Sequence, residues 1–369
     1  TLVGSVRDPR QLDTHGYAAE LEVERVLAGA FQPGDQVRIG WEEMAPSRRP
    51  RFRDGGRVLI ALEALPGYSL WRARFPDGRA HAVAFRGEAF LRDPDAKTVA
   101  HLQRFVALPE AERNEAAGVE SLTAMVAEAH ADVASSARDQ LARVSNLSSK
   151  LGDRAVAWFK QGLRDAERPS ELRESLLELI GRRKLSTLRS VVVELARPGA
   201  PLEAAATAAL AELDGTLPLE KVNTLLASPR AALRVVGVKW ARGSAAERRL
   251  TSLVRTDPDP AVRIAALETL VAWRGLLAYG DAEPALLDPE PAVRARAARA
   301  IGNLGPEIVP RLRSLLERSS RDEATGPIAA LAFSGEAGQA ALREVAAEHP
   351  DEQVRRLVAL ALGRNLDPH

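Results

Sequence analysis

The sequence predicts two structural classes in one chain: a small antiparallel β-barrel over residues 1–92, and an α-α superhelix over residues 117–369. Three observations predict this division. A chain of 369 residues exceeds the usual size of one domain. The first quarter consists of short β-like segments between turn residues. The second half repeats one motif about every 31 residues, a period typical of stacked helix pairs.

The β-like segments alternate apolar and polar residues, and Gly, Pro and Asp separate them. The turn Pro76-Asp77-Gly78 is predicted to close a hairpin. Five or six short antiparallel strands in about 90 residues predict a small closed barrel. The expected strands are Thr1–Arg7, Tyr17–Leu27, Gln36–Trp41, Arg57–Leu65, Ser69–Arg74 and Ala80–Phe85.

The pattern VLAG…PGDQVRIGW…RFRDGGRVLIAL resembles modules at the N-terminus of exported bacterial proteins. Those modules are similar to the OB-type barrel of the netrin and tissue-inhibitor-of-metalloproteinase families. The residues that carry the resemblance are Gly29, Gly34, Asp35, Gly56 and the segment Val58–Leu62. The resemblance implies an extracytoplasmic location (periplasm, cell surface or secreted), with the cytoplasm as the alternative. The first residue, Thr, is consistent with a mature form after removal of a signal peptide, or with a trimmed chain.

A basic loop within this module is a candidate partner-binding site. Arginines next to aromatic side chains are the combination that binds single-stranded nucleic acid, but the acidic Glu42, Glu43 and Asp54 crowd the same region. We interpret the aromatics as barrel core and the loop as solvated, with protein docking and nucleic-acid binding as alternatives. The arginines are Arg48, Arg49, Arg51 and Arg53, and the aromatics are Trp41, Tyr68, Trp71 and Phe75.

Residues 93–116 are predicted to be a connector helix and a linker. Val99, Leu102, Phe105 and Val106 share one helical face, and Pro109 ends the helix. A first helix pair is expected at 118–130 and 131–144. Later repeats are expected to open with helices at Gly152–Asp165, Ser186–Ala196, Leu219–Ala227, Ala245–Arg255, Pro306–Glu317 and Gly335–Glu348.

The repeated motif is clearest in DPDPAVRIAALETLVAWRG at 257–275 and DPEPAVRARAARAIGNLG at 288–305. Proline disfavours helix before itself and is tolerated in a first turn, so the segments that begin at Asp257 and Asp288 end one helix and start the next. Val262 and Val293 begin the apolar face of the new helix. Arg263 and Arg294 oppose the helix dipole. We therefore expect each arginine to pair with an aspartate of an adjacent turn, forming a ladder, with ordinary solvent exposure as the alternative.

The motif DPxPAVRxxAxxxL resembles the HEAT repeat, in the short form named after the phycobilisome lyases. Weaker copies lie in the same register at Leu172-Arg173, Leu202-Glu203, Leu233-Arg234, Ala324-Thr325 and Val354-Arg355, and an eighth at Val133. Steps from position 172 are 30, 31, 29, 31, 31 and 30 residues. The copies predict about eight repeats, an insertion around 145–154, and a ladder broken where Glu203 and Thr325 replace arginine.

One unit departs from the pattern. Leu276–Leu287 contains Tyr279-Gly280-Asp281 and Pro284, so its first helix is expected to be short or broken. We interpret this as an irregularity, with a bend or a site as the alternative.

Composition and motifs narrow the possible chemistry. The net charge is +1 and there is no cysteine, which excludes disulfides and thiolate sites in this sequence. No apolar run reaches the ~18–20 residues that a membrane span needs. The six histidines are scattered, and no nucleophile or phosphate-loop motif occurs. The sequence therefore predicts no enzyme activity, no metal and no cofactor.

A stack of repeats exposes a long surface that suits another macromolecule. We expect an exported, non-enzymatic binding or scaffold protein whose partner is a protein. One alternative is a filament-forming protein that self-assembles by stacking. A second is a nucleic-acid-binding or HEAT-like DNA-repair protein, for which Trp158, Trp240 and Trp273 could supply aromatics, although they fit helical core positions better. A bilin lyase is disfavoured because cysteine is absent.

Overall fold

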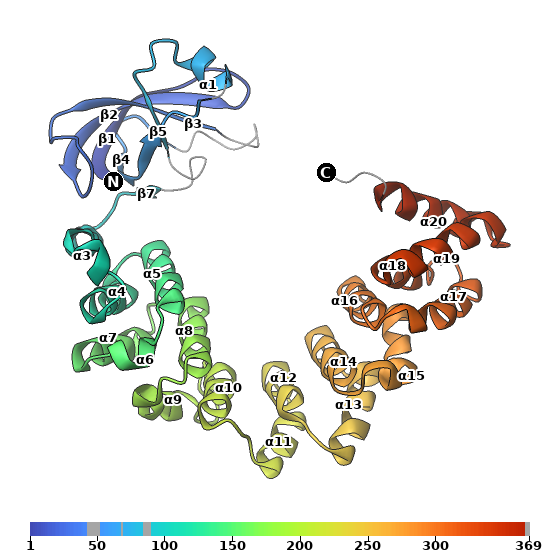
Figure 1. Ribbon diagram of the computed structural model, residues 1–369. Helices are drawn as coiled ribbons and strands as arrows, with labels where there is room; N and C mark the ends of the chain where they lie inside the picture. The colour runs from blue at the N-terminus through green and yellow to red at the C-terminus, as the bar shows by residue number, and fades with distance from the viewer. Residues whose placement is uncertain (43–51, 68, 84–89, 366–369) are drawn as a thin grey trace. The chain divides into compact units, whose positions relative to one another are not determined.

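The computed structural model describes residues 1–42, 52–67, 69–83 and 90–365. The chain forms two compact units, Thr1–Leu213 and Asp214–His369. Figure 1 shows a strand module followed by helices in the first unit, and helices throughout the second. The domain limits that the sequence suggests, at residues 92 and 117, stay a prediction.

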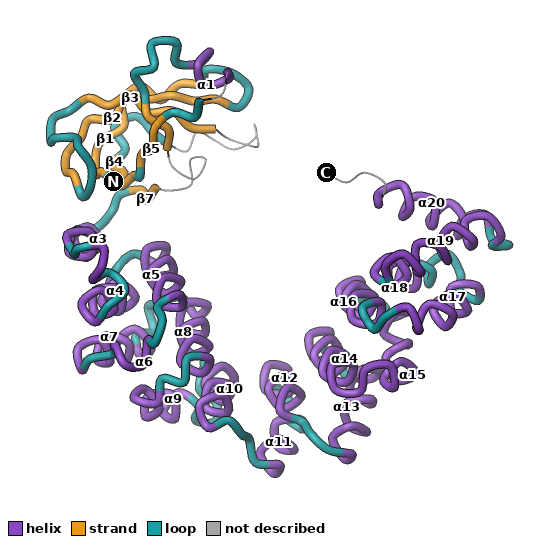
Figure 2. Tube along the Cα trace, in the orientation of Figure 1, coloured by secondary structure: helices purple, strands orange, loops and turns teal. Residues whose placement is uncertain are grey.

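Unit 1 begins with one curled sheet in the order β5-β6-β3-β2-β1-β4-β7 (Figure 2). A single residue, Ala61, separates β4 from β5, although the two strands pair with different neighbours. Because β5 forms one edge of the sheet and β4 lies next to the opposite edge strand, the sheet curls back on itself and forms a half-barrel. Its pairs are antiparallel except β3 with β6, which is parallel. The strands are β1 (Leu2–Gln11), β2 (Gly16–Val26), β3 (Gln36–Glu42), β4 (Arg57–Ile60), β5 (Leu62–Ala64), β6 (His81–Val83) and β7 (Phe90–Arg92).

The strand predicted at Ser69–Arg74 is wrong, because these residues form the helix α1 (Ser69–Arg74). The predicted hairpin at Pro76-Asp77-Gly78 is wrong for the same reason, and β6 pairs with β3 and β5 instead. Trp71 and Phe75 are four residues apart, so both reach the sheet from one side of the helix. They pack over Gly40, where an added Cβ would lie 2.6 Å from the Phe75 ring. Because Gly40 has no side chain, α1 can pack closely against the sheet at this position.

The helices of unit 1 follow the predicted order. The connector helix α3 (Ala96–Ala107) starts at Asp95, whose carboxylate accepts a hydrogen bond from the Thr98 N–H at 2.8 Å. The predicted insertion around 145–154 contains the short helix α6 (Leu147–Lys150). The other helices are α4 (Ala116–Glu128), α5 (Ala131–Arg143), α7 (Asp153–Arg164), α8 (Ser170–Arg182), α9 (Arg189–Leu195) and α10 (Glu203–Asp214).

The sheet is packed against these helices within unit 1. Val3, Leu59, Leu91 and Val99 form a buried cluster that joins β1, β4 and β7 to α3. The Arg57 guanidinium, from β4, also donates to the Pro94 carbonyl at 3.1 Å. Sheet and first helices therefore share a core.

Unit 2 stacks helix pairs around a second core. Val262, Val293 and Val354 are fully buried in it, which confirms the predicted register. The helices are α11 (Leu219–Leu226), α12 (Ala231–Trp240), α13 (Ser244–Thr256), α14 (Pro260–Arg274), α15 (Tyr279–Ala282), α16 (Pro291–Gly302), α17 (Val309–Glu317), α18 (Thr325–Phe333), α19 (Gly335–Glu348) and α20 (Glu352–Asn365).

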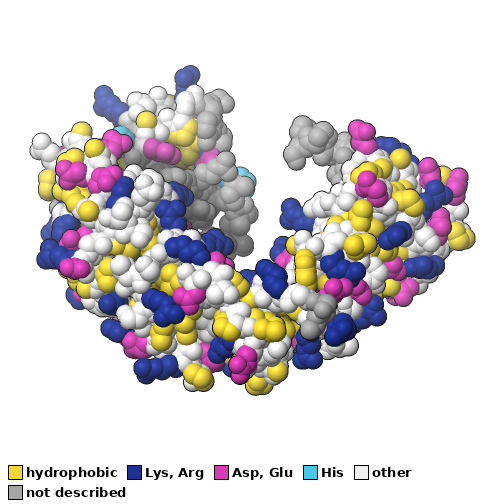
Figure 3. All heavy atoms as spheres, turned by 60° about the horizontal axis from the view of Figure 1, so that its bottom comes forward, with side chains coloured by type: hydrophobic (Ala, Val, Ile, Leu, Met, Phe, Trp, Pro, Cys, Tyr) yellow, Lys and Arg dark blue, Asp and Glu magenta, His cyan; other side chains and the backbone are white. Residues whose placement is uncertain are grey.

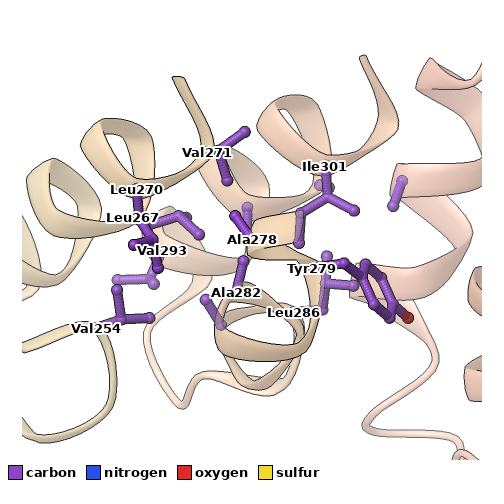
Figure 4. Close-up of a cluster of buried hydrophobic side chains, with 14 of the residues drawn as sticks. Val254, Leu267, Leu270, Val271, Ala278, Tyr279, Ala282, Leu286, Val293 and Ile301 are labelled. Carbon is purple, nitrogen blue, oxygen red and sulfur yellow. The ribbon is translucent and has the colours of Figure 1, made fainter. Parts of the chain in front are cut away.

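The irregular unit is broken, as predicted. Residues 275–287 form a 3-10 turn (Gly275–Ala278), the one-turn helix α15, and a second 3-10 turn (Glu283–Leu287) that contains Pro284. Figure 4 shows that Ala278, Ala282 and Leu286 nevertheless point into the same core as Leu270 of α14. Packing is thus preserved where the helix is interrupted.

Candidate functional site

The predicted arginine ladder exists in unit 2. Arg263, in the first turn of α14, donates from Nε and Nη2 to the two carboxylate oxygens of Asp288, both at 2.8 Å. Its Nη1 donates to the Asp257 carbonyl at 2.9 Å. The pair is largely buried, and the hydrogen bonds to Asp288 raise the pKa of the Arg263 guanidinium. These acceptors offset the unfavourable interaction between the positive charge of Arg263 and the dipole of α14.

An equivalent pair lies one repeat earlier. Arg234 donates to both oxygens of Asp257 at 2.8 Å. Burial by itself would raise the pKa of the Asp257 carboxyl, but hydrogen bonds from Arg234 and from the Asp259 N–H hold it below its ordinary value. Each aspartate thus accepts from the arginine of the preceding repeat and from the backbone that begins its own helix.

The ladder ends sooner than predicted. Arg294 donates to the Asp288 and Pro289 carbonyls, at 2.7 and 3.0 Å, and makes no carboxylate pair among the described residues. The position 31 residues after Asp288 is Ser319, whose buried hydroxyl donates to the Leu315 carbonyl. Arg355 likewise donates to backbone, reaching the Pro350 carbonyl at 3.2 Å. The expectation of a carboxylate partner for Arg294 is therefore wrong.

The basic loop of the strand module is mostly outside the described residues, including Arg48, Arg49 and Arg51. Arg53 is described and exposed. The nearby aromatics Trp41, Trp71 and Phe75 are buried, and Trp41 packs edge-on against Phe52 with 4.6 Å between ring centroids. Their interpretation as core is confirmed, so these three rings are unavailable for stacking on bases. Tyr68 is not described.

One tryptophan is an exception to the core interpretation. Trp158 and Trp240 are half-buried, whereas Trp273 is 41% exposed. Leu276 and Leu277 follow it at the broken unit and are 39% and 77% exposed. These three residues, which we call the Trp273 patch, are apolar side chains left in solvent beside a filled core. Leu276 and Leu277 lie in the 3-10 turn at 275–278, which offers them no continuous buried face, and Trp273 lies in the last turn of α14 just before it.

Unit 1 contains a cavity of about 600 Å³, which sequence reasoning missed. It lies where β4 and β7 meet α3, α4 and α5, and we call it the junction cavity. Its walls are apolar, and polar residues including Glu110, Arg113 and Asp132 line its remaining surface. The sequence places Leu102 and Phe105 on one helical face, but no linear pattern shows that strands from elsewhere oppose that face.

Basic and acidic side chains are mixed on the face drawn in Figure 3, so this face has no extended patch of a single charge. Among the described residues, no cluster of three or more His, Asp or Glu side chains has a geometry suited to a metal ion. None of the described helices combines the length and apolarity of a membrane-crossing segment. In the described part of unit 2, the Tyr279 hydroxyl and the His349 Nε2 are buried polar atoms without a hydrogen-bond partner.

Comparison with known proteins agrees with the repeat geometry. Residues 282–363 match the family model described as HEAT repeats. This segment carries HEAT repeats. Such repeats generally mediate protein interactions through the surface that their stacking exposes, and the described residues place a half-barrel before them.

Two solved structures are similar to this chain. The structure of human deoxyhypusine hydroxylase in complex with glycerol is 18% identical, covers 67% of this chain and 96% of its own, and has a TM-score of 0.31. The crystal structure of an engineered protein is also 18% identical, covers 67% of this chain and 95% of its own, and has a TM-score of 0.18. No curated protein matches the sequence.

Proposed function

We propose that this chain is a non-enzymatic scaffold that binds another protein through its HEAT repeats, and that it acts in the bacterial envelope or outside the cell. The observation that carries the proposal is the Trp273 patch. Tryptophan is among the residues most enriched at the centres of protein interfaces. Leu277 places most of its side chain in solvent although the adjacent Ala278 and Tyr279 are buried.

The surroundings of the patch favour a protein partner. Arg274 follows Trp273 and pairs with Glu247 at 2.8 Å and with Asp281 at 2.9 Å. The Arg274 guanidinium is thus occupied by two carboxylates, and apolar side chains with paired charges beside them are the usual composition of a protein interface. A phosphate backbone would instead require unpaired cations.

The location rests on the resemblance of the strand module to exported modules. The described half-barrel is compatible with it. Fractionation of source cells checks this part separately, because an exported protein is recovered from the periplasm or the culture supernatant.

Affinity capture with matched variants tests the proposal. The bait is the full chain in three forms: unchanged, Leu277→Glu, and the control Leu219→Glu, which alters an apolar residue that is 61% exposed at the start of α11. We expect one stoichiometric, nuclease-resistant protein to be retained by the unchanged chain and the control, and lost with Leu277→Glu.

Two other results would contradict the proposal. Equal capture by all three baits would remove the patch from the interface. Recovery of nucleic acid, with binding that falls steeply between low and moderate salt, would favour the nucleic-acid alternative. Light scattering of the bait alone, at several concentrations, tests self-assembly by stacking.

A further inference from the structure

The junction cavity has the size and lining of a small-molecule site. Its volume of about 600 Å³ lies within the range of ligand pockets, roughly 300–1,000 Å³. Three groups of elements line it: strands β4 and β7, the connector helix α3, and the first helix pair α4 and α5. Because the cavity is built from elements of both the half-barrel and the helices, it exists only in the folded unit.

Large apolar side chains around the cavity are incompletely buried. Phe90, Leu102, Phe105 and Val133 are only half-buried, although each packs at the margin of a hydrophobic cluster. The remaining surface of all four side chains contributes to the lining of the junction cavity. Covering that surface with an apolar molecule would remove it from water, which favours binding.

Polar groups at the cavity determine which head group fits. The Arg113 guanidinium donates to the carbonyls of Leu108 and Val106, at 3.2 and 3.0 Å, where it complements the C-terminal end of α3. The carboxylates of Glu110 and Asp132 are exposed. His130 Nδ1 accepts a hydrogen bond from the Asp132 N–H at 3.3 Å and lies 3.5 Å from the Asp132 carboxylate.

We propose that the junction cavity binds a small amphiphile, with an apolar chain against Phe90, Leu102 and Phe105 and a cationic head between the carboxylates of Glu110 and Asp132. The apolar walls supply the affinity, and the two carboxylates select the charge of the head. This site is distinct from the Trp273 patch, which lies in the other unit, so either can fail without the other.

Methionine NMR on the full chain provides a direct test. The chain has two methionines, Met44 and Met125, and Met125 lines the cavity. With methyl-labelled methionine, we expect n-decylamine to shift the Met125 signal saturably while the folded spectrum is retained. The signal is assigned with Met44→Leu. Decanol and decanoate are matched probes with the same chain and a neutral or anionic head.

Two sets of variants separate the contribution of the apolar walls to binding from that of the two carboxylates. Replacing both carboxylates (Glu110→Gln with Asp132→Asn) is expected to weaken decylamine binding about five-fold and to change decanol binding less than about two-fold. Glu112→Gln, an exposed acid on the same turn that does not line the cavity, is the control and should have no effect. Ser136→Phe, at an exposed position that lines the cavity, should weaken both probes about ten-fold.

The possible outcomes decide the proposal. An unmoved Met125 signal, in a chain that keeps its folded spectrum, overturns the site. Decanoate bound as tightly as decylamine overturns the assignment of a cationic head. If Ala137→Phe, which fills the cavity from α5, also leaves decylamine binding unchanged, the probe binds elsewhere and the proposal fails.

Discussion

Arg263 and Asp288 are 25 residues apart in the sequence and form an ion pair with two hydrogen bonds, which is largely buried between consecutive repeats. The same aspartate accepts a hydrogen bond at 2.9 Å from the Glu290 N–H, at the start of α16. One carboxylate therefore holds the backbone that leads into α16 and ties it to α14 of the preceding repeat. This link explains why the Asp-Pro-x-Pro segment and the arginine occur together in the motif.

Removing one partner of this pair should be costly. We expect Asp288→Ala to lower the free energy of unfolding of unit 2 by about 3–5 kcal/mol, because it leaves a buried guanidinium without its counter-charge. The control is Glu268→Ala, which breaks the exposed pair between Glu268 and Arg296 and should cost less than about 1 kcal/mol. Native-state hydrogen exchange of the α14–α16 amides measures both. If both variants lost the same free energy of unfolding, the buried pair would contribute no more to stability than the exposed one.

The broken ladder can be extended. Ser319 occupies the aspartate position opposite Arg294, so Ser319→Asp should give Arg294 a carboxylate partner. A double-mutant cycle with Arg294→Met is expected to show a coupling of about 1–3 kcal/mol between the two sites. Urea unfolding of the four proteins measures it. Strictly additive effects would contradict the proposed register.

Stability should depend on pH through Asp257. Its carboxyl pKa is lowered in the folded state, so the paired form contributes stability that is complete above the unfolded-state value of about 3.9 and is lost as the pH falls through the lower folded-state value. The stability advantage of the unchanged chain over Asp257→Asn should therefore be larger at about pH 7 than at about pH 3. Urea unfolding followed by circular dichroism at both pH values gives the difference. A constant difference would argue against the lowered pKa.

Two glycines near the broken unit should respond oppositely to alanine. Gly326 of α18 packs on the Leu286 carbonyl oxygen, which an added Cβ would overlap. We expect Gly326→Ala to destabilise unit 2 by about 1–3 kcal/mol or more. Gly280 of α15 has open space around an added Cβ, so Gly280→Ala should be neutral or stabilising by up to about 1 kcal/mol. Thermal unfolding of both variants, read against the unchanged chain, tests the contrast.

The sequence by itself determined the repeats. A 31-residue period between Val262 and Val293 fixes which residues face the core, because every α-helix has the same 3.6-residue turn and each repeat packs only on its neighbours. The same local rules correctly placed the break at Tyr279–Pro284 and predicted an aspartate partner for Arg263, although the partner expected for Arg294 is not found.

Tertiary structure decided the features that depend on contacts distant in sequence. Ser69–Arg74 became a helix because Trp71 found space over Gly40, in a strand about 30 residues earlier. Arg294 remained without a carboxylate because the next repeat offers Ser319. The junction cavity formed because β7 came to lie opposite α3 and α5. Periodicity reports which face of an element is apolar, whereas what covers that face is set by packing between distant segments of the chain.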